Sequence, residues 1–325
     1  TAANNGSGFW LGMLGQNSDI RMNRCQFKEN KTTNFSSAAN FWGTGGGTGT
    51  VAVASCIFEN NQSFWSGALE MGNGSGGTGT QVNYWLTNST FKNNQSTEGG
   101  AMTLWCDSTS KANFLVENCL MEENNSTGNG GGIVFNPSGP DFNATVRRSR
   151  ITGNHSAVAG GAVHIYHYLQ NVPFPTNATI LFENCLINGN TSAGAAVFVD
   201  SLPNLQFLNC TVAGNTGGGI QLSDKSGLTF QNTILHNPGY PEYQAFAGDA
   251  TVKSNGGNLI GDGSLSGYAL SYDLQNADPI FAGGGDFHLA DNSPAIDKGV
   301  NLGNLPTTDL DGNARENGCV DIGAY

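Results

Sequence analysis

Charged side chains are scarce in this sequence. Only 12% of the 325 residues are charged, Lys and Arg together number 13, and the formal net charge is −12. Such a chain is poorly suited to nucleic acid, whose binding depends on basic surfaces. No run approaches the roughly 18 apolar residues that span a bilayer, so we expect no membrane span.

Helical periodicity is missing as well. No window of about 15 residues keeps apolar positions at helical spacing without Gly, Asn or Thr interrupting it. The chain holds instead 47 Gly, together with abundant Asn, Ser and Thr, which favour turns and strands. These features predict an all-β protein.

The chain also lacks a starting Met and a signal peptide, since it begins at Thr1. We interpret it as a mature secreted segment or a portion of a longer precursor. Its seven cysteines are an odd number, so at least one is free or pairs between chains.

What the sequence does contain is a repeat. Small residues recur at intervals of 23 to 36 residues, in a column formed by Cys25, Cys56, Ser89, Cys119, Ser149, Cys185, Cys210 and Thr233. An apolar residue follows each member two positions later, and apolar pairs precede most of them, as Phe114 and Val116 precede Cys119. Alternation with a period of two predicts a strand at every repeat. We expect the column cysteines to pack as buried thiols.

A second column stands five residues after the first. It consists of Asn30, Asn61, Asn94, Asn124, Asn154, Asn190 and Asn215, whereas Asn237 comes one residue early. Asn tolerates a left-handed backbone, and its amide can form hydrogen bonds along a stack. We therefore expect these asparagines to make the tight turn of each coil and to form a hydrogen-bonded ladder.

A third column begins with glycine pairs such as Gly99–Gly100 and Gly160–Gly161, each followed by another alternating strand. Gly permits bends and close approach between coils. Parallel strands stacked by right-handed crossovers form a right-handed parallel β-helix. We expect about ten coils over residues 1–260, followed by an irregular capping segment over residues 261–325.

These patterns resemble known families. The C-x-F/I/V-x-x-N and G-G-A pattern is similar to that of the right-handed β-helix repeat proteins of the pectate-lyase-like superfamily. The end of the chain resembles the conserved terminal portion of bacterial choice-of-anchor surface proteins, on the segments Asp278-Pro279-Ile280-Phe281, Ser293-Pro294-Ala295-Ile296-Asp297 and Val320-Asp321-Ile322-Gly323-Ala324-Tyr325. The resemblance implies secretion and a cell-surface location but no activity, because the fold hosts many functions.

The coils offer few residues for catalysis. A polysaccharide lyase needs carboxylates and a nearby base, and a glycoside hydrolase needs two neighbouring carboxylates. Of the 15 Asp residues, 10 lie after residue 240, so we predict no catalytic residue and no cofactor other than a structural metal. Arg147, Arg148 and Arg150 form a basic cluster, with His164, placed outward by the alternation, and His167 one strand later. The cluster is either a site for an acidic sugar or a solvated basic patch.

A structural calcium site is one interpretation of the acidic residues near the C-terminus. Asp309, Asp311 and Asn313 have the spacing of the start of a calcium loop, and Asp321 or Glu316 could complete an irregular site. The glycine that an EF-hand needs next is absent. Asx-turns in a capping segment are the alternative.

N-glycosylation sequons are dense. Those on the asparagine column should face inward and carry no glycan, which leaves Asn5, Asn34, Asn73, Asn88, Asn143 and Asn177 as candidate attachment sites in loops.

All the tryptophans fall in the first 105 residues, at Trp10, Trp42, Trp65, Trp85 and Trp105. Aliphatic residues and Phe already fill the inward positions, so we expect several of these rings on loops or the outer surface. There they would bind a glycan, form a protein interface, or pack against the coils.

Together these features predict a non-catalytic extracellular or cell-surface structural or adhesive protein. Its partners would be surface glycans or copies of itself, and head-to-tail stacking of copies would give filaments. A carbohydrate-active enzyme and a glycan-binding module on the same fold are the alternatives.

Overall fold

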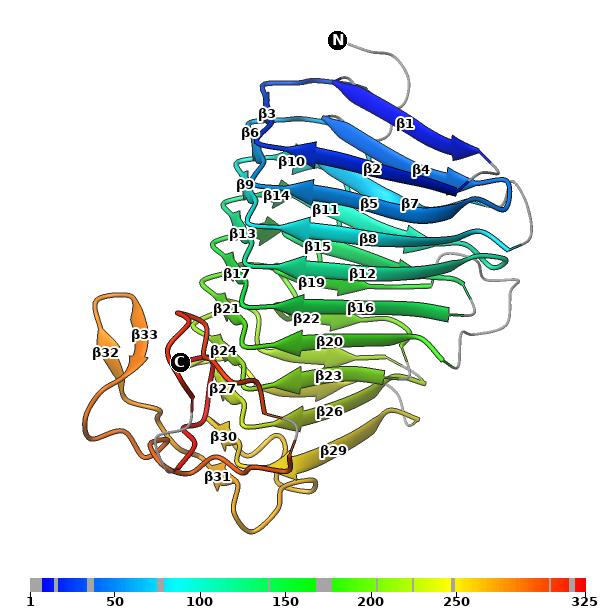
Figure 1. Cartoon of the computed structure of the whole chain (residues 1–325). Coiled ribbons are helices and arrows are strands. Elements are labelled where there is room, and N and C mark those ends of the chain that lie inside the picture. Colours follow the sequence, from blue (N-terminus) through cyan, green and yellow to red (C-terminus); the bar gives the residue numbers. More distant parts are fainter. Residues whose placement is uncertain are drawn as a thin grey trace.

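A computed structural model describes residues 8–14, 17–33, 38–74, 79–139, 141–167, 177–202, 204–223, 225–246, 249–303, 305–315 and 319–325. These residues form a parallel β-helix, a stack of coils whose strands lie across its long axis (Figure 1). None of the described residues is helical. No described helix could therefore span a membrane.

The front sheet faces the viewer in Figure 1. Its parallel strands are β2 (Asn17–Asn23), β5 (Thr48–Ala54), β8 (Gln81–Thr87), β12 (Lys111–Glu117), β16 (Asp141–Arg147), β20 (Thr179–Glu183), β23 (Asn204–Leu208), β26 (Gly227–Gln231) and β29 (Thr251–Gly256). Each pairs only with the strands of the coils before and after it.

The back sheet lies behind the front sheet. It contains β1 (Phe9–Leu14), β4 (Ala39–Thr44), β7 (Leu69–Asn73), β11 (Met102–Cys106), β15 (Ile133–Pro137), β19 (Val163–Ile165), β22 (Val197–Val199), β25 (Ile220–Leu222) and β28 (Tyr243–Ala245). All its pairings are parallel.

The side sheet joins the two large sheets along one edge. It contains β3 (Gln26–Lys28), β6 (Ile57–Glu59), β9 (Thr90–Lys92), β13 (Leu120–Glu122), β17 (Arg150–Thr152), β21 (Leu186–Asn188), β24 (Thr211–Ala213), β27 (Ile234–His236), β30 (Leu259–Ile260) and β31 (Leu274–Gln275). Three short strands, β10 (Gln95–Ser96), β14 (Asn125–Ser126) and β18 (His155–Ser156), form a small parallel sheet at the next corner. Since β31 pairs with β30, the stacking continues past residue 260.

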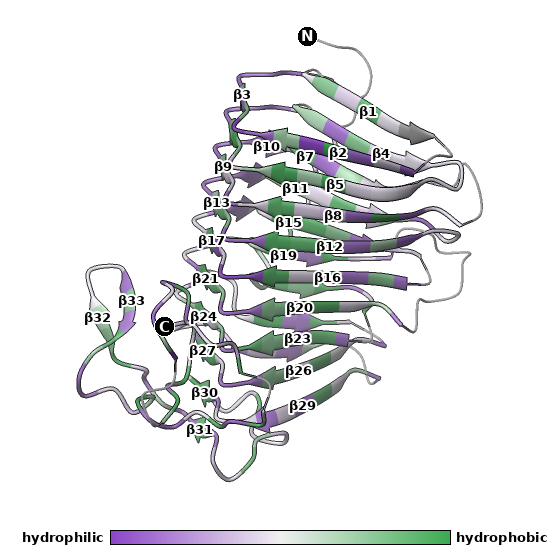
Figure 2. Ribbon diagram, in the orientation of Figure 1, coloured by the Kyte–Doolittle hydropathy of each residue, from purple (hydrophilic) through white to green (hydrophobic). Residues whose placement is uncertain are grey.

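The alternation of the sequence sets which side chains enter the core. In β8, Val82, Tyr84 and Leu86 are buried, whereas the residues between them are outward. Figure 2 shows this alternation of hydrophilic and hydrophobic residues along the front strands. Because the register is kept from coil to coil, each inward residue meets its counterpart in the next coil.

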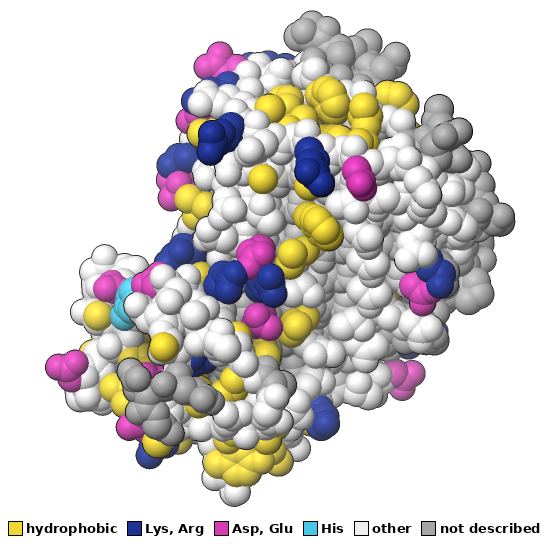
Figure 3. Space-filling view, viewed as in Figure 1, with side chains coloured by type: hydrophobic (Ala, Val, Ile, Leu, Met, Phe, Trp, Pro, Cys, Tyr) yellow, Lys and Arg dark blue, Asp and Glu magenta, His cyan; other side chains and the backbone are white. Residues whose placement is uncertain are grey.

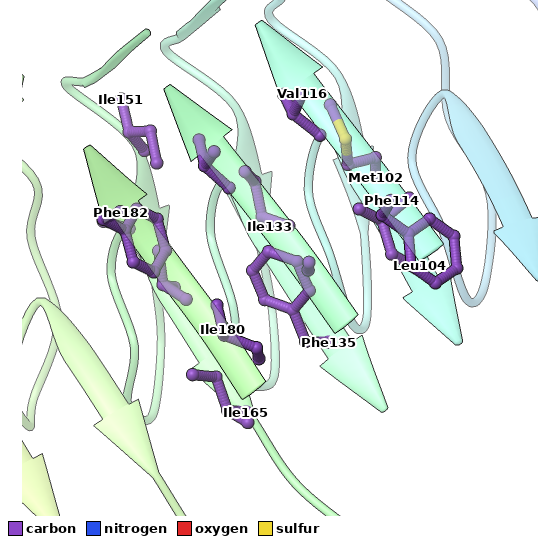
Figure 4. Packing of buried hydrophobic residues seen from close by; sticks show 14 of the residues in the cluster. Met102, Leu104, Phe114, Val116, Ile133, Phe135, Ile151, Ile165, Ile180 and Phe182 are labelled. Atoms are coloured by element: carbon purple, nitrogen blue, oxygen red, sulfur yellow. The ribbon is translucent and has the colours of Figure 1, made fainter. Parts of the chain in front are cut away.

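The core is therefore built as stacks of similar side chains. Phe114 of the front sheet and Leu104 of the back sheet point toward each other inside the coils (Figure 4). Rings stack along the axis, with a centroid distance of 4.6 Å between Phe58 and Phe91. Such burial of aromatic and aliphatic groups in every coil is the main source of stability.

The left-handed residues at the corners lie one position before the columns. One corner uses Arg24, Ser55, Asn88, Asn118, Arg148, Asn184, Asn209 and Asn232, and the next uses Glu29, Asn60, Asn93, Glu123, Gly153, Gly189 and Gly214. Their φ values run from 45° to 64°. The prediction that the column asparagines are themselves left-handed is wrong, because the bend is made just before them and their side chains are free to point inward.

The asparagine column forms a continuous ladder. Each Nδ2 from Asn30 to Asn215 donates to the Oδ1 of the next coil's asparagine at 2.8–2.9 Å. Asn237 ends the series, because its backbone N and its Nδ2 each donate at 2.6 Å to one carboxylate oxygen of Glu242. Burial raises the pKa of Glu242 to about 7, although the donors of Asn237 act to lower it.

The first column also connects neighbouring coils. Ser89 Oγ accepts a hydrogen bond from Cys56 N at 3.1 Å, and Ser149 Oγ accepts one from Cys119 N at 3.1 Å. The predicted ladder cysteines, Cys25, Cys56, Cys119, Cys185 and Cys210, all have free thiols, and all but the half-buried Cys25 are buried. This column also ends on a carboxylate. Thr233 N donates to Asn258 Oδ1 at 2.9 Å, and Asn258 in turn donates to Asp273 Oδ1 from its backbone N at 2.9 Å and from its Nδ2 at 3.0 Å.

The C-terminal segment folds back along the side sheet. It includes the antiparallel hairpin of β32 (Phe281–Gly283) and β33 (Asp286–Leu289), which projects from the lower part of the coils in Figure 1. Arg315 secures the segment, because its guanidinium is buried and donates to Asn184 Oδ1 at 2.7 Å and to the carbonyls of Gly323 and Ala324.

Candidate functional site

The two middle rows of outward positions on the front sheet contain uncharged residues from β5 to β26, and we call these two rows the platform. From β5 to β26 the platform consists of Thr50, Ala52, Asn83, Trp85, Asn113, Leu115, Asn143, Thr145, Thr179, Leu181, Asn204, Gln206 and Thr229. In Figure 3 this face is largely white, with scattered hydrophobic side chains and a group of charged side chains near its middle. Charged residues flank it in the same rows, namely Asp19 and Arg21 in β2 and Lys253 in β29. They also flank it in the adjoining outward rows, with Lys111 and Asp141 on one side and Glu117, Arg147 and Glu183 on the other.

Trp85 is the most prominent side chain of the platform. It is 49% exposed and lies in register between Ala52 of the preceding coil and Leu115 of the following one. The short side chain of Ala52 leaves a shallow groove of about 120 Å³ beside the ring, which also reaches Asp19 and Arg21 of the first coil.

An amide row runs next to the groove. Asn113 Nδ2 donates to Asn83 Oδ1 at 2.9 Å, and Asn143 Nδ2 donates to Asn113 Oδ1 at 3.3 Å. Because each carboxamide has two N–H donors and two acceptor lone pairs, these bonds use only part of its capacity. The remaining donors and acceptors face solvent, so the row can bind hydroxyl groups.

The predicted basic cluster is divided between two faces. Arg147 Nε lies 3.0 Å from Glu117 Oε1, Arg148 pairs with the same carboxylate, and Arg150 lies 2.6 Å from Asp311 Oδ1. The arginines are thus paired with carboxylates and do not form a free basic patch. Since the front and back sheets are separated by the core, the arginines do not share a site with the two histidines.

His164 lies on the outer face of the back sheet, with His167 following its strand. It is at an outward position but only 5% exposed. Its ring stacks between those of Tyr166 and Phe198, at centroid distances of 4.9 and 5.3 Å. The packing of these rings explains why an outward residue is buried.

The predicted calcium ligands are directed to different partners. Asp309 Oδ1 accepts hydrogen bonds from the backbone N of Asp311 and of Asn313 at 2.9 and 2.8 Å, which is Asx-turn geometry. Asp311 pairs with Arg150, and Asp321 Oδ1 accepts the backbone N of Asp297 at 2.7 Å. Among the described residues no three His, Cys, Asp or Glu side chains are grouped closely enough to hold a metal.

The candidate glycosylation sites differ in accessibility. Asn73 is fully buried, its Nδ2 donates to the carbonyl of Lys111 and its Oδ1 accepts from Tyr84 Oη, so the prediction of a glycan at Asn73 is wrong. Asn88, Asn143 and Asn177 are exposed and stay candidates. Asn5 and Asn34 lie outside the described residues.

Four of the five tryptophans lie in strands rather than in loops, and Trp65 precedes β7 in a connecting segment. Trp42 and Trp105 pack edge to face at 5.6 Å above Gly72, where a Cβ would fall 2.6 Å from the Trp105 ring. Trp10 in β1 is 48% exposed, similar to Trp85, but it belongs to the back sheet.

The platform was missed at the sequence level. Asn83, Asn113 and Asn143 recur at intervals of 30 residues, and this interval was the available signal. It was obscured because Asn143 stands in a sequon and because outward positions have no hydrophobic pattern to define them.

Comparison with known proteins supports the fold alone. The family described as right handed beta helix region matches residues 168–261, which are the coils nearest the C-terminal segment. No curated protein and no solved structure matches the chain. The likeness to the pectate-lyase-like superfamily and to the choice-of-anchor terminus stays a prediction.

Proposed function

We propose that this protein is a non-catalytic extracellular adhesive β-helix that binds an uncharged surface polysaccharide along the platform. The observation that carries the proposal is the half-exposed indole of Trp85 beside a row of uncharged, solvent-facing amides. An aromatic face stacks on the apolar face of a sugar ring, while carboxamides donate to and accept from its hydroxyl groups.

The repeat of the coils suits a polymer. Neighbouring strands lie about 4.8 Å apart, so a polysaccharide lying along the axis meets a new amide or hydroxyl group on every coil it crosses. Weak contacts repeated along one chain add up to useful avidity. The rigid core keeps these groups in register before the ligand arrives, which lowers the entropic cost of binding.

The charge of the protein favours a neutral ligand. The platform is uncharged from β5 to β26, and the whole chain carries a net charge of −12. An anionic polysaccharide would be repelled by this charge. The ligand class is therefore a neutral glycan rather than a uronate.

The enzyme alternative would need a second carboxylate in the groove. Hydrolysis uses two carboxyl groups roughly 5–9.5 Å apart, whereas Asp19 is the only carboxylate among the residues lining the groove beside Trp85. For this reason the proposal assigns binding, not cleavage, to the platform.

Copies of the chain remain a second proposed partner, but not through continued strand pairing. At the C-terminal end, Tyr243 N of β28 donates to Ser264 Oγ, and Leu265 is buried in the core. A stacked copy would have to displace this covering loop. Adhesion through the lateral face needs no such displacement.

The test compares two equally exposed tryptophans. Affinity electrophoresis against neutral and anionic polysaccharides should show retardation by neutral polymers alone. W85A should weaken binding about tenfold, which corresponds to about 1.4 kcal/mol, while W10A should leave it unchanged. Equal effects of the two variants would contradict the assignment to the platform, and new reducing ends in the presence of protein would establish the enzyme alternative.

A further inference from the structure

The first column contains two pairs of cysteines in neighbouring coils, Cys25 with Cys56 and Cys185 with Cys210. The coils are held in register, since Ile57 N donates to the Cys25 carbonyl and Thr211 N to the Cys185 carbonyl, each at 2.9 Å. Neighbouring strands about 4.8 Å apart fall within the Cα separations of disulfides, about 4.4–6.8 Å.

The thiols of the first pair point the same way. Cys25 Sγ donates to the carbonyl of Asn23 at 3.6 Å, and Cys56 Sγ donates to that of Ala54 at 3.2 Å. Each contact joins a thiol to the carbonyl two residues earlier. The two side chains are therefore aligned side by side in neighbouring coils.

The two pairs differ in access and in freedom to move. Cys25 is half-buried, whereas Cys185 and Cys210 are both fully buried. Among the described strands, β3 pairs only with β6, while β21 and β24 each have a neighbour on both sides. Parallel side chains must approach slightly to reach disulfide geometry, and the first coil is the one able to shift.

We propose that Cys25 and Cys56 are a site of thiol–disulfide exchange, at which a low-molecular-weight disulfide converts the pair into a disulfide between the first two coils. The thiolate of Cys25 attacks one sulfur of the reagent and releases one small thiolate. The thiolate of Cys56 then attacks Cys25 Sγ in the mixed disulfide and releases the second. The two protein protons go to the two released thiolates, so two protein thiols and one disulfide give one protein disulfide and two small thiols.

The order of attack follows from burial. Burial raises the pKa of the Cys56 thiol. Because the thiolate is the reactive form, the more accessible, half-buried Cys25 reacts first, and the second step becomes faster as the pH rises. The product ties the first described coil to the coil beneath it.

The experiment uses the full chain with C319S, which removes the exposed thiol. The folded protein is treated with oxidised glutathione at pH 8, alkylated after unfolding, and digested for mass spectrometry. Two of the six remaining thiols should be lost, in one cross-linked peptide that joins Cys25 to Cys56. Cys185 and Cys210 should be alkylated only after unfolding, and thus serve as the matched control pair.

Serine variants complete the test, because Ser89 and Ser149 show that the column accepts serine. Both C25S and C56S should abolish the cross-link, and C56S should leave glutathione attached to Cys25. Retention of all six thiols, glutathione on Cys25 without cross-linking in the presence of Cys56, or equal oxidation of both pairs would each overturn the proposal.

Discussion

Two asparagine rows run along this molecule at the same axial spacing, one inside the coils and one on the platform. Inside, Asn124 makes hydrogen bonds to the coils on both sides and has no contact with solvent. Outside, Asn113 also bonds to both neighbours, yet it is exposed. The same residue type therefore specifies the fold where it is buried inside the coils. Where it is exposed on the platform, it keeps hydrogen-bonding capacity for a ligand.

The largest expected effect comes from breaking the inner ladder. N124A removes a side chain that donates to Phe91 O and Asn154 Oδ1 and accepts from Asn94. At about 1 kcal/mol per bond, with buried partners left unpaired, the free energy of unfolding should fall by about 3 kcal/mol or more. Urea denaturation measures this. A loss similar to that of N113A would show that burial does not distinguish the two rows.

The carboxylate that ends the inner ladder should give a pH dependence. The pKa of Glu242 is raised to about 7 in the folded protein, so its contribution to stability is complete below the unfolded pKa, near 4.5, and is lost as the pH rises through about 7. The change should be about 3 kcal/mol. In E242Q, the denaturation midpoint should fall less between pH 4.5 and 7 than it does in the wild-type protein. An equal fall in both proteins would show that other groups cause it.

An intermediate case is an outward asparagine covered by the C-terminal segment. N184G keeps a residue suited to positive φ but removes the bonds to Thr308 O and Arg315. We expect a loss of about 1–2 kcal/mol and faster proteolysis within residues 261–325. N118G, at the same corner but without these contacts, is the control. Identical proteolysis rates would mean that Asn184 does not hold the segment.

The smallest effect on stability should accompany a change in binding. N113A should alter the free energy of unfolding by no more than about 0.5 kcal/mol, as is usual for exposed positions. Its affinity for a neutral polysaccharide should drop about threefold to tenfold, which affinity electrophoresis can resolve. A stable N113A with unaltered affinity would remove the amide row from the proposed site.

The coil architecture could be predicted from the sequence because residues of the same kind recur periodically at the inward positions. The column from Cys25 to Thr233 and the asparagines from Asn30 to Asn215 locate the corners, and the apolar alternation locates the strands. The left-handed corner is also visible in the sequence, because Asn recurs directly before the first column, as at Asn118 and Asn184.

What the sequence could not show is which outward residues become covered. His164 is buried by ring stacking, and Arg150 is paired with Asp311, 161 residues away. Asn73 is buried in the last position of its strand, where the pattern predicts a loop. Periodicity distinguishes inward from outward, but it contains no information on long-range contacts made outside the coils.

The carboxylates of Glu242 and Asp273 give the stack a direction and set where it can grow. Every bond between two ladder side chains runs from the Nδ2 of one asparagine to the Oδ1 on its C-terminal side, and a carboxylate accepts such a bond without donating onward. A duplicated coil inserted ahead of these residues would find a donor on one side and an acceptor on the other. The same coil placed after them would meet no donor, so the length of this protein can be changed by insertion within the stack but not by extension beyond its acidic end.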